Sequence, residues 1–184
     1  MAAEASGCEF GWKAVDFDLP GVDGRRYNLA AARGPHGLLV VFLSNHCPYV
    51  KAIRPRLVRD CSELVQHGIN TIAINSNDPT NYPEDSFENM KRVAAEHHFP
   101  FPYVFDATQE VARAYGAVCT PDFFGFNAAL ELQYRGRLDA SRVTLVPDAR
   151  RELFDAMVEI ARSGRGPTEQ IPSIGCSIKW KHAA

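Results

Sequence analysis

Residues 38–50 read LLVVFLSNHCPYV, and they carry the strongest structural signal in the chain. Its first half, Leu38–Leu43, is a continuous apolar run, as expected for a β-strand that is buried on both faces of a sheet. Asn45–Cys47 then turns into a helix, and Pro48 stands near the first helical position, where the missing N–H of proline is harmless. The stretch therefore predicts a cysteine between the carboxyl end of a buried strand and the N-terminus of a helix.

Apolar periodicity predicts further helices and strands on both sides of this stretch. An apolar stripe at helical spacing follows Cys47, with Pro55 inside the helix as an expected kink and Gly68 as its end. Further helices are predicted over Pro83–His98, Thr108–Tyr115 and Pro147–Ser163. Further strands are predicted over Ala14–Leu19, Arg25–Leu29, Ile69–Ser76, Tyr103–Phe105, Phe123–Asn127 and Glu131–Leu138.

The alternation of strands and helices predicts the fold class. It favours an α/β protein with a central mixed β-sheet flanked by helices, with an N-terminal β-hairpin extension. A chain of 184 residues suits one hydrophobic core. We expect a flexible arm over residues 1–10, a domain over residues 11–163 and an irregular C-terminal tail over residues 164–184.

Charge and hydropathy exclude some partner classes. The net charge is −2, and residues of both signs are mixed along the chain. The sequence therefore does not predict the basic surface that binds nucleic acid or an acidic membrane. The longest apolar run is too short to span a bilayer. Met1–Phe10 lacks the apolar core of a secretory signal, so a cytoplasmic protein is expected.

The cysteines are scattered along the chain. There are five of them, and an odd number at such spacings is no disulfide framework. No Cys/His cluster has the spacing of a zinc site, and Lys51 breaks the CxxxC pattern of copper delivery, so neither a metal nor another cofactor is expected. Cys61 lies on the apolar stripe of its helix as a core residue, and Cys8 lies on the arm.

Cys47 is the candidate nucleophile. Free N–H groups and the partial positive charge of a helix N-terminus stabilise a thiolate. His46 could assist as a cation or proton carrier. The alternative reading is a buried structural cysteine, and the strand–turn–helix context favours reactivity.

Parts of the sequence resemble known protein families. Cys-Pro-Tyr-Val at residues 47–50 resembles the CxxC motifs of glutaredoxins and thioredoxins, with Val50 in place of the second cysteine. Residues 11–29, Ile72–Asn75 and Phe101–Gly116 resemble the redoxin superfamily, in its peroxiredoxin-like (AhpC/TSA-like) branch. The likeness covers about residues 10–163 and implies the thioredoxin fold.

Val118–Phe124 resembles the loop of thioredoxins that carries a cis-proline facing the active-site cysteine. The resemblance implies a cis peptide bond at Pro121 and a Thr120 backbone that binds an extended peptide by strand-like hydrogen bonds. Cys119 then either lies near Cys47 as a candidate resolving thiol or packs under the loop.

The tail, Pro172–Lys181, resembles that of an uncharacterised peroxiredoxin-like branch. A cysteine on a flexible tail can reach a sulfenic acid formed elsewhere, which makes Cys176 a second candidate resolving thiol. Alternatively, Ile178 and Trp180 simply pin the tail and Cys176 has no redox role.

The resemblance implies a thiol-based oxidoreductase. Peroxiredoxins carry Pro-x-x-x-Thr-x-x-Cys, and here Ser44 matches the Thr position while Val40 replaces the proline. Cys47 is expected to attack a peroxide or a protein or small-molecule disulfide, with an external thiol as reductant, and the chain could form a homodimer. The alternative is a non-catalytic redox-sensing or peptide-binding module, which the loss of the CxxC partner favours.

Overall fold

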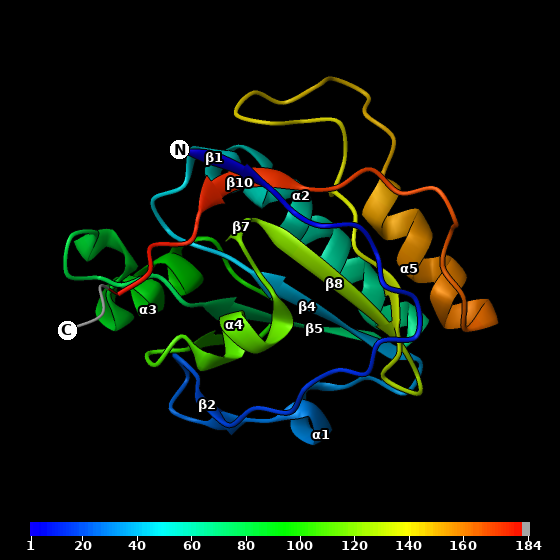
Figure 1. The fold of residues 1–184 in the computed structure, drawn as a ribbon, viewed down its shortest axis with the longest axis horizontal. Helices are drawn as coiled ribbons and strands as arrows, with labels where there is room; N and C mark the ends of the chain where they lie inside the picture. Colours follow the sequence, from blue (N-terminus) through cyan, green and yellow to red (C-terminus); the bar gives the residue numbers. More distant parts are fainter. Residues whose placement is uncertain (182–184) are drawn as a thin grey trace.

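A five-stranded mixed sheet forms the centre of the computed structural model, which describes residues 1–181 (Figure 1). Three neighbouring strands are parallel, the fourth is antiparallel to the third, and the fifth is antiparallel to the fourth. In spatial order they are β6 (Tyr103–Phe105), β5 (Ile69–Asn75), β4 (Gly37–Phe42), β8 (Asp122–Asn127) and β9 (Leu132–Tyr134). The buried run of the sequence is thus the middle strand, as its unbroken apolar character requires.

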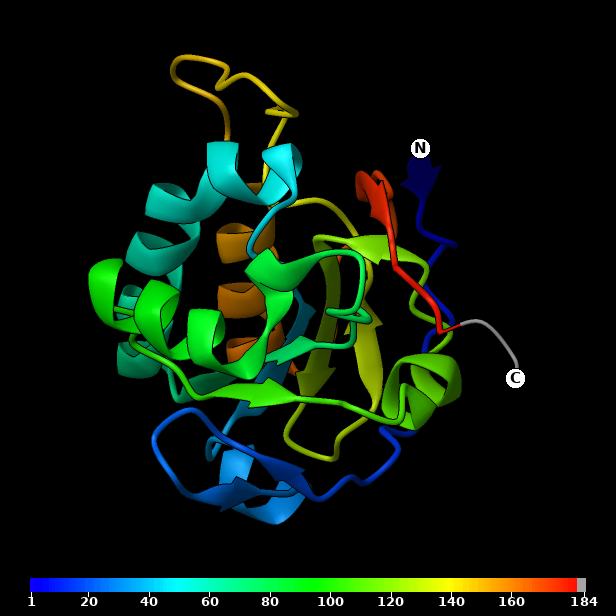
Figure 2. The ribbon, with the colours of Figure 1, turned by 90° about the vertical axis from the view of Figure 1, so that its left-hand side faces the viewer.

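Helices cover both faces of this sheet because successive side chains of β4 point to opposite sides. Leu39 and Val41 pack into one core, and Leu38 and Val40 pack into the other. The first core lies under α2 (Pro48–Leu64), α3 (Phe87–Glu96) and α5 (Glu152–Ser163). The second lies under α1 (Leu29–Ala32), α4 (Glu110–Tyr115) and the hairpin of β2 (Leu19–Pro20) and β3 (Arg26–Tyr27) (Figure 2). The predicted fold class, including the N-terminal hairpin, is confirmed.

The two chain ends form a second, smaller sheet. β1 (Ala2–Glu4) pairs with β10 (Ile174–Ser177), and β10 pairs with β7 (Cys119–Thr120), all antiparallel. Figure 1 shows β1 and β10 side by side. The structure here differs from the expected flexible arm and irregular tail, because each short segment gains its hydrogen bonds from a partner distant in sequence.

Three helices begin later than predicted: α3 starts at Phe87, α4 at Glu110 and α5 at Glu152. Residues Pro83–Asp85 form a 3-10 turn, η2, and α3 starts only after Ser86, whose hydroxyl accepts a hydrogen bond from the Asn89 N–H. A second 3-10 turn, η1 (Val65–His67), follows α2 directly and ends at Gly68. The segment before α5 is a protruding loop that Arg56 holds through hydrogen bonds to Asp139, Ser141 and the Val146 carbonyl.

Candidate functional site

Cys47 is the N-cap residue of α2, with Pro48 in the first turn. Its side chain is fully buried, and its thiol donates a hydrogen bond to the Thr120 carbonyl oxygen at 3.1 Å. The hydroxyls of Ser44 and Thr120 also contact each other at 3.1 Å. The structure thus brings into contact the two segments that the sequence analysis singled out, the strand-to-helix turn and the proline loop.

The Thr120–Pro121 peptide bond is cis, and its carbonyl side faces Cys47. The expectation of a free Thr120 backbone is not met, however. β10 lies along β7 with Cys176 directly opposite Thr120. Any external peptide would have to replace this strand.

Cys176 lies against Cys47 as a consequence of that register. Burial is the main cause that raises the pKa of the Cys176 thiol to about 11, and the neighbouring Cys47 side chain raises it further. Cys176 therefore keeps its proton at neutral pH. A protonated, half-buried thiol stands beside the candidate nucleophile.

Cys119 precedes Thr120 on the short strand β7, so its side chain points to the opposite face. Its thiol donates to the Pro121 carbonyl oxygen at 3.6 Å. Burial, followed by the nearby Asp122 carboxylate, raises the pKa of Cys119. Cys119 thus packs under the proline loop, and its thiol stays protonated there.

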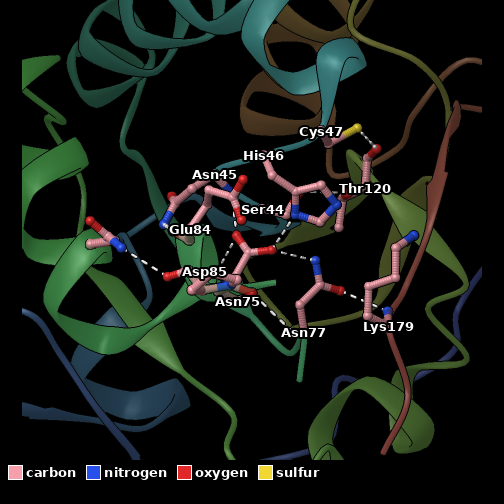
Figure 3. A network of polar contacts seen from close by, with 12 residues as sticks. Ser44, Asn45, His46, Cys47, Asn75, Asn77, Glu84, Asp85, Thr120 and Lys179 are labelled. Carbon is pink, nitrogen blue, oxygen red and sulfur yellow. Dashed lines mark hydrogen bonds and ion pairs between the residues drawn. The ribbon is translucent and has the colours of Figure 1, made fainter. Parts of the chain in front are cut away.

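His46 is fixed by a buried carboxylate that the sequence does not reveal. Its Nδ1 lies 2.5 Å from Oδ2 of Asp85, and its ring stacks on Tyr82 with centroids 4.8 Å apart. Asp85 is completely buried in η2 (Figure 3). A helix over Pro83–His98 would place Asp85 in its first turn, and no local sequence pattern points to the inward position of its side chain.

Asp85 is held in its ionised form by its donors. Burial alone would raise its pKa, but hydrogen bonds from His46, Asn77 and the Asn45 N–H lower it below its usual value. An ionised carboxylate only accepts hydrogen bonds, so Nδ1 of His46 is the donor. The second ring nitrogen, Nε2, is then free to accept or carry a proton.

The same network ties down the C-terminal segment. Asn77 donates to Asp85 at 2.9 Å, while its side-chain oxygen accepts the Lys179 N–H at 2.8 Å. Figure 3 shows Asn77 between the carboxylate and the backbone that follows β10. The position of the tail and the orientation of His46 therefore depend on one set of hydrogen bonds.

The remaining cysteines lie apart from this site. Burial raises the pKa of Cys61 to about 12 in the core under α2, in line with its place on the apolar stripe. Cys8 packs against the second core. Among residues 1–181, no group of three or more metal-ligating side chains could hold a metal ion.

The comparisons with known proteins identify the family. Residues 10–152 match the model of the AhpC/TSA family. The chain belongs to this family. No curated protein matches the sequence. Membership supports a thiol-based redox function.

Two solved structures are similar to almost the whole chain. An uncharacterized conserved protein from Geobacillus kaustophilus is 45% identical with a TM-score of 0.94, covering 100% of this chain and 98% of that one. A hypothetical protein from Sinorhizobium meliloti 1021 is 38% identical with a TM-score of 0.91, covering 98% and 99%.

A more distant structure shows the fold alone. Peroxidoxin BcpB from Mycobacterium tuberculosis is 14% identical with a TM-score of 0.63, covering 86% of this chain and 99% of that one. The thioredoxin fold predicted for this AhpC/TSA family member is therefore confirmed. No helix within residues 1–181 is long and apolar enough to cross a membrane.

Proposed function

We propose that this chain is a thiol-dependent oxidoreductase in which Cys47 is the nucleophile and Cys176 is the resolving thiol. The observation that carries the proposal is the position of Cys176: β10 places it directly opposite Thr120, whose carbonyl oxygen accepts the hydrogen bond of the Cys47 thiol. Cys119 faces the other side of β7 and packs under the loop. Of the two candidate resolving thiols, the contacts favour Cys176.

The reaction with a hydroperoxide balances as follows. The Cys47 thiolate attacks the terminal peroxide oxygen, the O–O bond breaks, and the departing oxygen takes up a proton as an alcohol or water. The Cys176 thiol then attacks the sulfenic sulfur, its proton leaves with the hydroxyl as water, and a disulfide remains. An external dithiol reduces this disulfide and returns both thiols.

His46 is the group we assign to the proton transfers. Its hydrogen bond to Asp85 holds the ring in one orientation, as the base of an activated nucleophile requires. With Nδ1 occupied, Nε2 is the nitrogen that takes a proton from the Cys47 thiol and returns it to the departing oxygen. Asp85 acts through His46, so it is a positioning residue.

The test is turnover with hydrogen peroxide and a dithiol, combined with dimedone trapping of sulfenic acid. We expect the wild type to consume peroxide and Cys47→Ser to consume none above background. Cys176→Ser should accumulate a dimedone adduct on Cys47, while the matched variant Cys119→Ser should behave like the wild type. Absence of oxidation at Cys47 would contradict the proposal.

A redox sensor is distinguished by the same experiment. A sensor oxidises once, without sustained turnover when dithiol is supplied. Insulin reduction measures activity on protein disulfides separately from activity on peroxide.

A further inference from the structure

β7 is a short strand whose outer edge would be open without β10. Strand edges bind extended segments through backbone hydrogen bonds. This edge lies immediately beside Cys47, because the Thr120 carbonyl accepts the Cys47 thiol. β10 covers it from the far end of the sequence, with Cys176 at the position opposite Thr120.

The fit of β10 on this edge depends on a glycine. A Cβ atom built on Gly175 would lie 2.0 Å from the Thr120 carbonyl oxygen and 3.0 Å from the Pro121 nitrogen. Both are backbone atoms of the proline loop, so the movement of a flexible side chain could not relieve this clash. A segment that binds here with its cysteine beside Cys47 must therefore carry glycine just before that cysteine.

The attachment of β10 continues beyond the strand as a chain of polar contacts. Gln109 donates to the Lys179 carbonyl oxygen at 2.8 Å and accepts the Lys181 N–H at 2.8 Å. The Ile178 N–H donates to the Val118 carbonyl oxygen at 3.0 Å, and Arg113 stacks on Trp180 at 4.4 Å. These contacts hold the last residues of the described chain. Breaking them therefore frees one end of β10 and leaves the packing of the core in place.

We infer that the β7 edge is a binding site for an extended Gly-Cys peptide, and that β10 is its tethered internal occupant. This inference rests on the proposed function for its chemistry. A tethered strand competes at an effective concentration in the range of about millimolar, so an external peptide binds only when the attachment of β10 is weakened.

The substrate class that follows is a peptide whose Gly-Cys cysteine is in a disulfide. The Cys47 thiolate attacks that cysteine sulfur, the substrate S–S bond breaks, and the departing sulfur leaves as a thiol with a proton. When β10 returns, the Cys176 thiol attacks the Cys47 sulfur and the peptide leaves as a thiol with the Cys176 proton. The Cys47–Cys176 disulfide is then reduced by an external dithiol.

The experiment uses full-length variants and a fluorescent peptide, Pro-Ser-Ile-Gly-Ser-Ser-Ile-Lys-Trp-Lys, which copies residues 172–181 with serine for Cys176. Without a cysteine, its binding is independent of redox activity. Gly175→Ala should release β10, and Gly7→Ala is the matched control, since no atom lies within 4 Å of a Cβ there. A second variant, Gln109→Asn, shortens the side chain that holds Lys179, and Asn tolerates the positive φ of 64° at this position.

Hydrogen exchange at the amides of Ile178 and Lys179 reports whether the tail has left. We expect faster exchange and peptide binding by fluorescence anisotropy in Gly175→Ala and Gln109→Asn, and neither in the wild type or Gly7→Ala. A peptide with alanine for its glycine should bind at least tenfold more weakly. Free tails without peptide binding, equal binding of both peptides, or tails that stay protected in both variants would overturn the inference.

Discussion

Asp85 shows how one buried carboxylate organises the site at the scale of single residues. It accepts hydrogen bonds from the backbone of Asn45 and from the side chains of His46, Asn75 and Asn77. The first two of these residues directly precede Cys47 in the chain. Asp85 therefore sets both the turn that presents the thiol and the orientation of the imidazole.

The first prediction concerns the rate of oxidation of Cys47. His46→Gln should lower the second-order rate constant for peroxide by about 100-fold, the range of a lost proton-transfer group. Asp85→Asn should also slow the reaction, because it releases the ring. If Asp85 acts through His46, the double variant is no slower than His46→Gln. Added imidazole should partly restore the rate in the two variants that lack the His46 ring. Additive losses in stopped-flow measurements would contradict this coupling.

The second prediction follows from the lowered pKa of Asp85. A carboxyl whose folded pKa lies below its unfolded value stabilises the protein above the unfolded value of about 3.9, and this contribution is lost as the pH falls through the folded pKa. Asp85→Asn should thus lower the free energy of unfolding by about 2–3 kcal/mol at pH 7. The difference should shrink in acid.

Urea denaturation at pH 7 and at about pH 3 measures this difference. Glu84→Gln is the control, because Glu84 is the exposed neighbour in the same 3-10 turn. A loss of equal size at both pH values would show that Asp85 contributes by shape rather than by charge.

At the scale of elements, the late start of α3 is what allows Asp85 to turn inward. Ser86 caps the helix after the 3-10 turn, so Pro83–Asp85 is free of the helical geometry that the sequence predicts for it. A helix starting at Pro83 would place Asp85 in its first turn as a surface acid. The cap and the site are therefore parts of the same local structure.

Ser86→Ala should lower the free energy of unfolding by about 1 kcal/mol, the usual cost of a lost N-cap. Ser62→Ala is the comparison, since its hydroxyl bonds only to the Val58 carbonyl within α2. Chemical denaturation of both variants provides the measurement. Equal, negligible effects would mean that the Ser86 hydroxyl does not stabilise the start of α3.

The sequence predicts the elements with strong local patterns. Leu38–Leu43 forms the central strand, and the turn at Cys47 begins a helix because Pro48 and the apolar stripe specify it. β1 and β10 could not be foreseen, because each is short and its hydrogen bonds come from distant segments. The role of Asp85 could not be predicted for the same reason, since its partners at residues 45, 46, 75 and 77 come together only in the folded chain.

At the scale of the whole molecule, the two chain ends meet over the nucleophile. The Ser177 N–H donates to the Met1 carbonyl oxygen at 3.0 Å, and β1 covers the outer edge of β10. The small sheet therefore joins the N-terminus, the C-terminal segment and the proline loop at one place. A covalent bond between Cys47 and Cys176 would fix this junction.

Oxidation should therefore stabilise the fold. A Cys47–Cys176 disulfide closes a loop of about 130 residues, and the loop-entropy relation gives up to about 5 kcal/mol for such a crosslink. The urea midpoint should be higher for peroxide-treated protein than for protein kept in dithiol. Cys119→Ser should keep this difference and Cys176→Ser should lose it. Equal midpoints in oxidised and reduced wild type would contradict the expectation.

Peptide mapping after treatment with one equivalent of hydrogen peroxide shows directly whether Cys176 resolves oxidised Cys47. Wild-type protein is oxidised, blocked with an alkylating agent, digested and analysed by mass spectrometry without reduction. We expect a crosslinked pair of peptides that contain Cys47 and Cys176, with Cys119 recovered as an alkylated thiol. A crosslink from Cys47 to Cys119, or a Cys47 that stays a free thiol, would contradict this expectation.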